Sequence, residues 1–132
     1  MAIELSRVEE FALIRLNRPQ ALNALSFKLV EDLARAIDEV AASGARALLV
    51  TGAGEKAFSA GNDLKWTAMH GVPRMPEGGF GGLVARDIWK PLIAAVNGAA
   101  MGAGCDLACM CDIRIAAQSA RFAENFVKLG LI

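Results

Sequence analysis

Two short stretches near the start of the sequence, residues 3–8 and 11–16, alternate apolar and polar side chains, and an acidic pair separates them. Alternation with a period of two is typical of half-buried strands, so the two stretches predict a β-hairpin. Apolar residues then recur at helical spacing between Ser26 and Gly44. A serine can cap the first turn of a helix, and a glycine can end it. The pattern therefore predicts two strands followed by a helix.

The rest of the sequence alternates short apolar runs with glycine-containing turns and helical segments. The runs at 45–52 and 92–98 are almost continuously apolar, which is typical of strands buried on both faces. Residues 71–82 are rich in glycine and proline and predict a flexible loop. Further elements are expected as helices at about 63–69, 83–89 and 102–111 and as a strand at 112–117. This alternation of strands and helices predicts an α/β fold.

Composition excludes several classes of function. The chain has 132 residues, of which 55% are apolar, and this is enough for one domain with a core. Its 14 acidic and 14 basic residues give a net charge of zero, so nothing indicates binding to nucleic acid or to an anionic membrane. The N-terminus lacks the pattern of a signal peptide, and the apolar runs are too short to span a bilayer. A soluble, cytoplasmic protein is expected.

Three cysteines, Cys105, Cys109 and Cys111, cluster among apolar residues. An odd, clustered set is not typical of a disulfide framework. Their C-x3-C-x-C spacing is not that of a zinc site, and His70, the single histidine, is distant in sequence. The cysteines are therefore predicted to be buried, reduced thiols on a packed helix, with no metal bound.

Two glycine-containing turns, within residues 58–64 and 97–106, each follow an apolar run and lead into a helix. Glycine lets a ligand approach the backbone, and the start of a helix offers free N–H groups. If the turns face one another, they could bind an oxyanion such as a developing enolate. Close packing is an equally ordinary reason for such glycines. A nucleotide phosphate loop is excluded, because Gly52-Ala53-Gly54 lacks a third glycine and Lys56 comes too early.

Four segments resemble the crotonase (enoyl-CoA hydratase/isomerase) family in their order and spacing. They are NRP with ALNAL at 17–25, LLVTGAGEKAFSAGNDL at 48–64, KPLIAAVNGAAMGAGCDLACMCDIRIAA at 90–117, and ARF at 120–122. The resemblance covers nearly the whole chain and implies the family's spiral of ββα turns. It also implies that residues 1–132 are one incomplete acyl-CoA-binding domain, the N-terminal half of a longer protein and truncated at its C-terminal side.

Carried over position by position, the resemblance places an oxyanion hole at the backbone N–H groups of Asn62 and Ala103. The implied contacts with CoA fall on Ala60, Asn62, Asp63, Leu64, Lys56 and Ala103. Lys56 and Arg18 could meet the CoA phosphates, although exposed cations are more often only solvated. CoA would arrive as part of the substrate, so no separate cofactor and no metal are expected.

The family's hydratases use two glutamates, one to activate water and one to deliver a proton at Cα. The first corresponds to Asp106, which keeps the carboxylate but is one methylene shorter. The second corresponds to Phe126, which is not an acid. Glu124 lies two residues earlier and shares the face of Phe126 if this stretch is extended. Apart from the resemblance, Asp106 would be interpreted as a residue that stabilises a helix N-terminus.

The resemblance therefore implies an enoyl-CoA hydratase-like enzyme with Asp106 as acid/base and Glu124 as a further candidate. One alternative is an enoyl-CoA isomerase or another enolate reaction, in which a single acid moves a proton between carbons. A second alternative is a non-catalytic acyl-CoA-binding fragment. The partner in each case is an acyl-CoA. Because family members are commonly trimers or hexamers, a homo-oligomer is expected.

Overall fold

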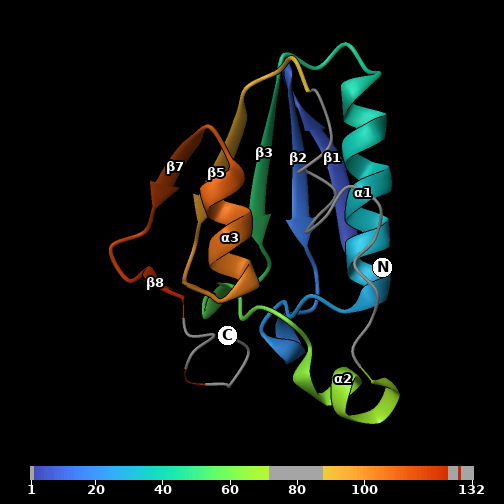
Figure 1. Ribbon diagram of the computed structural model, residues 1–132. Helices are drawn as coiled ribbons and strands as arrows, with labels where there is room; N and C mark the ends of the chain where they lie inside the picture. Colours follow the sequence, from blue (N-terminus) through green and yellow to red (C-terminus); the bar gives the residue numbers. More distant parts are fainter. Residues whose placement is uncertain (1, 72–87, 125–127, 129–132) are drawn as a thin grey trace.

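The computed structural model describes residues 2–71, 88–124 and 128 (Figure 1). The predicted loop at 71–82 and the predicted helix at 83–89 lie outside these residues, apart from Gly71, Ile88 and Trp89. In the described part, strands and helices alternate along the chain as the sequence predicts. The α/β class is therefore confirmed.

A five-stranded sheet forms the centre of the fold (Figure 1). Its strand order is β1-β2-β3-β5-β7. The strands are β1 (Ile3–Val8), β2 (Phe11–Leu16), β3 (Ala47–Gly52), β5 (Leu92–Val96) and β7 (Ile113–Ala116). The predicted hairpin is confirmed, because β1 and β2 pair in antiparallel register from Ile3 opposite Leu16 to Val8 opposite Phe11. All other neighbours in this sheet are parallel.

A second, smaller sheet lies at the end of the first and was not predicted. It contains β4 (Ala57–Ser59), β6 (Ala99–Met101) and β8 (Arg121–Ala123) in the order β4-β6-β8. Its strands are parallel to one another and have three residues each. Each strand follows, after a short turn, a strand of the large sheet. The chain therefore passes repeatedly from the large sheet to the small one.

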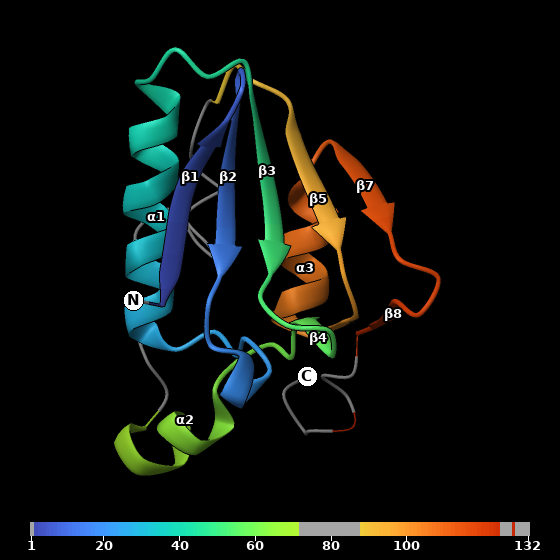
Figure 2. The same ribbon diagram turned by 180° about the vertical axis from the view of Figure 1, so that it is seen from behind.

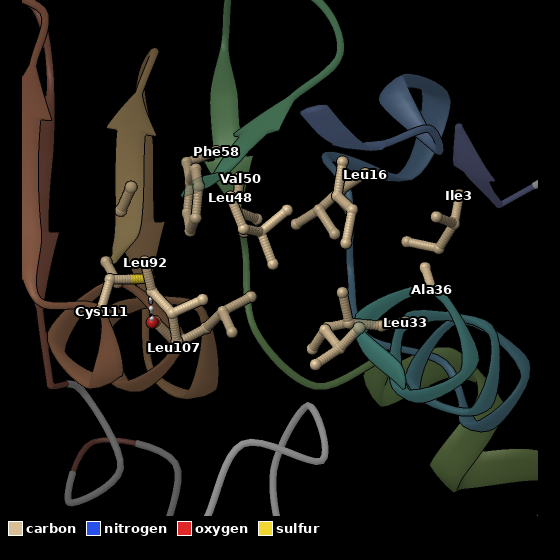
Figure 3. Close-up of a cluster of buried hydrophobic side chains, with 14 of the residues drawn as sticks. Ile3, Leu16, Leu33, Ala36, Leu48, Val50, Phe58, Leu92, Leu107 and Cys111 are labelled. Atoms are coloured by element: carbon tan, nitrogen blue, oxygen red, sulfur yellow. Dashed lines mark hydrogen bonds between the residues drawn. The ribbon is translucent and has the colours of Figure 1, made fainter. Parts of the chain in front are cut away.

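Two helices, α1 (Phe27–Ala41) and α3 (Ala103–Met110), cover one face of the large sheet (Figure 1). Figure 2 shows the sheet from the opposite side, with both helices behind it. The third helix, α2 (Leu64–His70), lies beyond the end of the sheet. Inward-facing side chains from the sheet and from α1 and α3 form one apolar core (Figure 3). Its fully buried members include Ile14, Leu16, Leu29, Leu33, Ile37, Leu48, Phe58 and Leu107.

The start of α1 matches the sequence prediction, but its end does not. The Ser26 side chain accepts a hydrogen bond of 3.2 Å from the N–H of Leu29, as expected of a cap. The helix ends at Ala41 and not at Gly44. Two side chains bond carbonyl groups at and just after its end, because the Ser43 hydroxyl donates to Val40 O and the Lys90 ammonium donates to Val40 O and Ser43 O. The glycine is therefore not needed as the terminating residue.

Replacing Lys90 with methionine should lower the free energy of unfolding by about 1–2 kcal/mol, because the ammonium makes two charged hydrogen bonds at a helix C-terminus. The two N···O distances are 2.8 Å to Val40 and 2.6 Å to Ser43. Urea unfolding of both proteins measures the difference. Lys28→Met is the matched control, since Lys28 makes only an exposed ion pair with Asp32, worth about 0.5 kcal/mol or less. Equal losses in the two variants would contradict the capping role of Lys90.

The three cysteines are free, and their burial corrects one prediction. Cys105 and Cys111 are buried, but Cys109 is exposed because it lies on the outer side of α3. None of the helices in the described ranges is long and apolar enough to cross a membrane. Within the same ranges, no three His, Cys, Asp or Glu side chains are grouped so that they could hold a metal ion.

Candidate functional site

The two glycine-containing turns singled out in the sequence lie side by side. Strands β4 and β6 are parallel neighbours, so their carboxyl ends open at the same edge of the small sheet. The chain leaves β4 through Ala60 and Gly61 towards Asn62, and it leaves β6 through Gly102 into α3. Both turns therefore lie at the N-terminal end of α3 (Figures 1 and 2).

Backbone atoms of the two turns are in direct contact. A Cβ atom on Gly61 would lie 2.7 Å from the carbonyl oxygen of Met101 and 3.3 Å from the nitrogen of Ala103. A Cβ atom on Gly104 would collide with the carbonyl oxygen of Ser59. Gly61 also has a φ of 92°, which favours glycine. Only residues without a side chain allow the turns to approach this closely, so the two turns face one another.

The N–H of Asn62 points away from Leu25, the residue that is paired with it. Asn62 forms an isolated parallel bridge with Leu25, in which the Leu25 N–H donates to Gly61 O at 2.6 Å and the Asp63 N–H donates to Leu25 O at 3.3 Å. Such a bridge uses the neighbours of Asn62, and its own N–H and C=O point to the other side. Among the described residues, no hydrogen bond uses the N–H of Asn62.

Ala103 offers a second unbonded N–H. It is the first residue of α3, and the first N–H groups of a helix have no partner within the helix. Over the described ranges no other group accepts its N–H. The residue does not have a positive φ, and its side chain is fully buried, so its methyl group fits where a glycine would also fit.

Asp106 and Glu124 approach one another near the start of α3, the helix that begins with Ala103. Asp106 is half-buried in the first turn of α3, and Glu124 directly follows β8. The Gly102 N–H donates to Ala123 O at 2.8 Å, which fixes the end of β8 against the start of α3. Burial, together with a hydrogen bond from Glu124 and the negative charge of that residue, raises the pKa of Asp106 to about 6. Phe126 lies outside the described residues.

The thiol of Cys105 is also near the Glu124 carboxylate, but it is a poor nucleophile. Burial, followed by smaller contributions from Glu124 and Cys109, raises its pKa to about 12. The thiolate is the reactive form of cysteine, and it is nearly absent at neutral pH when the pKa is this high. Among the described residues, the two carboxyl groups are therefore the candidates for proton transfer at this place.

The other predicted contacts with CoA fall on two different surfaces. Lys56 is exposed and lines a cavity of about 310 Å³. The other lining residues are Pro19, Leu22, Asn23, Ala53, Gly54, Glu55 and Ala57. Asp63 caps α2, accepting from the Trp66 N–H at 3.1 Å, and Leu64 is the exposed first residue of that helix. Ala60 is half-buried between β4 and Asn62.

Arg18 has a different environment from the one predicted. Its guanidinium donates to the carbonyl oxygen of Ala24 at 2.7 Å and to the carboxylate of Asp63 at 3.0 Å. The pKa of Asp63 is lowered below its usual value, mainly by the hydrogen bond from the Trp66 N–H and further by Arg18. Arg18 also lines a second cavity of about 590 Å³, with Lys28 and Trp66. Much of its hydrogen-bonding capacity is therefore used within the protein.

Asn23 and Ser59 were not singled out in the sequence, although both support the turn that carries Asn62. Both side chains are completely buried. The Asn23 side chain accepts from the Arg18 N–H at 2.9 Å and donates to the carbonyl oxygens of Ala53 and Ala57 at 3.0 Å each. The only available signal was a polar residue inside the apolar run ALNAL. That pattern alone does not distinguish a buried asparagine from an exposed one.

Comparisons with known proteins agree on one family. The sequence model of the family described as Enoyl-CoA hydratase/isomerase matches residues 7–132. Short-chain-enoyl-CoA hydratase of Clostridium acetobutylicum is 41% identical over 132 residues, which cover 96% of this chain and 51% of that protein. Crotonyl-CoA hydratase of Syntrophomonas wolfei is 39% identical over 136 residues, which cover 98% of this chain and 52% of that protein.

Solved structures show the same similarity in three dimensions. A carnitinyl-CoA dehydratase from Mycobacterium avium superimposes with a TM-score of 0.92 at 40% identity, over 99% of this chain and 53% of that one. An enoyl-CoA hydratase from Mycobacterium tuberculosis gives a TM-score of 0.90 at 36% identity, over 99% of this chain and 52% of that one. The chain thus spans about half the length of the relatives that it matches.

Proposed function

This chain belongs to the enoyl-CoA hydratase/isomerase family, and on that premise we propose that the protein is an enoyl-CoA hydratase-like enzyme acting on an acyl-CoA thioester. The family and the crotonase-type fold predicted from the sequence are both confirmed. The observation that carries the proposal is the backbone contact between the two turns. It leaves the N–H groups of Asn62 and Ala103 without partners in the described residues, at one edge of the small sheet.

In the proposed mechanism, the thioester oxygen accepts hydrogen bonds from the N–H groups of Asn62 and Ala103. As a nucleophile adds to the double bond, negative charge moves onto this oxygen and the two bonds strengthen. One donor of this kind is worth about 3 kcal/mol in the transition state. Backbone donors held by a helix and by a β-bridge are already oriented, so little reorganisation accompanies the reaction.

The carboxyl groups of Asp106 and Glu124 are proposed to handle the protons. Burial and the neighbouring negative charge of Glu124 raise the pKa of Asp106 to about 6, so Asp106 carries a proton below that pH. The ionised group takes a proton from water while the water oxygen bonds to Cβ. The protonated group gives its proton to Cα as the double bond is lost. The pair ends with one proton, as it began, and one water molecule has been added to the substrate.

The nucleotide part of CoA is proposed to bind near Lys56. The cavity of about 310 Å³ there has apolar walls from Leu22 and Pro19, and the Lys56 ammonium can meet a phosphate. The turn from Ala60 to Leu64 would then contact the pantetheine arm on its way to Asn62. Acyl-CoA is the expected partner, in a homo-oligomer as in the family. A cytoplasmic location stays a prediction.

Incubation with crotonyl-CoA tests the proposed function. Loss of the enoyl-thioester absorbance with formation of the 3-hydroxyacyl product would support hydration. A shift of the double bond in a longer enoyl-CoA, without uptake of water, would instead identify an isomerase, which the sequence favours in one respect because Phe126 replaces the second acid. Tight binding of CoA thioesters without turnover, and unchanged by Asp106→Ala, would identify a non-catalytic binder.

A further inference from the structure

Arg18 lies where the loop after β2 meets the turn that carries Asn62. Its guanidinium makes two hydrogen bonds, to Ala24 O at 2.7 Å and to the Asp63 carboxylate at 3.0 Å. The side chains of Arg18 and Asp63 are only 22% and 14% exposed. An ion pair this well buried is screened less by salt than a surface pair, and two fixed donors give it a defined direction.

The two acceptors of Arg18 flank the β-bridge between Leu25 and Asn62. Ala24 directly precedes Leu25, and Asp63 directly follows Asn62. The guanidinium therefore connects the two backbone segments that form the bridge and holds them at a fixed separation. Because the bridge sets the direction of the Asn62 N–H, any change in that separation would turn this N–H away from its present direction.

A second set of hydrogen bonds, made by Asn23 and Ser59, supports the same bridge. The Asn23 side chain accepts the backbone N–H of Arg18 at 2.9 Å. The Ser59 hydroxyl donates to Asn23 O at 2.8 Å and accepts from the Gly61 N–H at 3.2 Å. Asn23 and Ser59 fix the backbone before the bridge residues, whereas Arg18 alone joins Ala24 to Asp63. The guanidinium is thus the only one of these groups that acts on the residue after Asn62.

We propose that Arg18 is a positioning residue, which fixes the direction of the Asn62 N–H through Ala24 and Asp63, and is not a ligand of the CoA phosphates. This inference rests on the proposed function, because it assigns a purpose to the direction of that N–H. A lysine at this position would keep the charge but has no planar fork to reach both acceptors. Replacing Arg18 with lysine is therefore expected to slow the chemical step and to change substrate binding little.

Arg18→Lys should lower kcat for crotonyl-CoA by about 10–100-fold, since small errors in the position of a catalytic group can cost this much. KM should change by less than about threefold, because the lost interaction strengthens only in the transition state. The same loss is expected with crotonyl-pantetheine, which lacks the nucleotide. A phosphate ligand would behave differently, with a raised KM for crotonyl-CoA and no effect on crotonyl-pantetheine. That second pattern would overturn the inference.

A spectroscopic probe reads the direction of the N–H without turnover. A cinnamoyl-CoA with a para-dimethylamino group absorbs at longer wavelength when its thioester oxygen accepts hydrogen bonds, because negative charge then moves onto that oxygen. Wild type should give this red shift, and Arg18→Lys should give a smaller one at saturating probe. Asp63→Asn keeps a side chain able to cap α2 but removes the charge, so it should act in the same direction, and the double variant should lose little more.

Arg15→Lys is the matched control, because within the described part of the chain Arg15 makes only an exposed ion pair with Glu4, and the variant should leave kcat and the red shift unchanged. Unfolding curves show that each variant is folded at the assay temperature. If wild type is active and Arg18→Lys and Asp63→Asn match it in kcat and in red shift, the inference is wrong and the proposed function stands. If wild type gives neither turnover nor a red shift, the proposed function fails and the inference fails with it.

Discussion

Replacing Asp106 with asparagine is expected to lower kcat/KM for crotonyl-CoA by about 10²-fold or more, the usual contribution of a general acid or base. Asparagine keeps the size of the side chain and cannot exchange a proton. Glu124→Gln should have an effect of similar size, and the double variant should lose little more than either single variant, since the two groups act as a pair. Glu39→Gln, on the exposed side of α1, is the control.

The pH dependence of the same variant gives an independent measurement. Because the pKa of Asp106 is raised to about 6, the pair should lose its proton as the pH rises above about 6, and wild-type activity should fall because no protonated carboxyl group is left to supply Cα. This limb of the profile should be absent from the residual activity of Asp106→Asn. A profile with no inflection within roughly one pH unit of 6 would contradict the assigned role.

Asp106→Asn should also make the protein more stable at neutral pH. The pKa of this carboxyl group rises on folding from 3.8 to about 6, so its charged form is disfavoured in the folded state. That cost is absent below pH 3.8, develops as the pH rises, and is complete above pH 6. Because the group is partly exposed, the gain at pH 8 should be about 1 kcal/mol, and it should vanish towards pH 4. Urea unfolding at these two pH values measures the gain.

Gly104→Ala is expected to lower the free energy of unfolding by about 3 kcal/mol, near the upper range for overpacking. The added Cβ would collide with the carbonyl oxygen of Ser59 and would lie 2.8 Å from its Cβ. Ser59 is completely buried in β4, so its backbone cannot move aside cheaply. Separation of β4 from α3 would also part the two turns, and activity should fall together with stability.

The matched control is Gly44→Ala. A Cβ atom on Gly44 would meet nothing within 4 Å, and the residue does not have a positive φ. This substitution should leave stability unchanged or raise it by up to about 1 kcal/mol, because alanine has less conformational freedom in the unfolded chain. Chemical denaturation of both variants gives the comparison. Similar stabilities for the two variants would mean that β4 and α3 are not packed as closely as described.

The parts of the fold that follow from local patterns were predicted, and those that depend on distant partners were not. Residues 3–8 and 11–16 form the expected strands because alternation is a property of the stretch itself. The end of α1 was missed because Lys90, far along the sequence, completes its capping. The three strands of the small sheet have three residues each, which is too short to show a period. They exist because each pairs with another.

The same distinction applies to the candidate site. The resemblance named Asn62, Ala103 and Asp106 because each lies in a recognisable motif. The resemblance also offered Glu124 as a second acid, but its placement beside Asp106 depends on β8 lying beside β6, which no local pattern indicates. For Arg18 the sequence left open whether it meets a CoA phosphate or is only solvated. Its actual acceptor, the Asp63 carboxylate, lies 45 positions further along the sequence, and no local pattern joins the two residues.

The mixed order of the large sheet has a consequence for how the chain folds. Only β1 and β2 are joined by a tight turn, whereas every parallel pair, such as β2 with β3 or β3 with β5, is separated by a long crossover. Closing those crossovers loses chain entropy before any pairing is gained, so such sheets fold slowly. The hairpin can form within microseconds and act as the template on which β3 docks. We therefore expect the hairpin of β1 and β2 to form before the parallel strands add to the sheet.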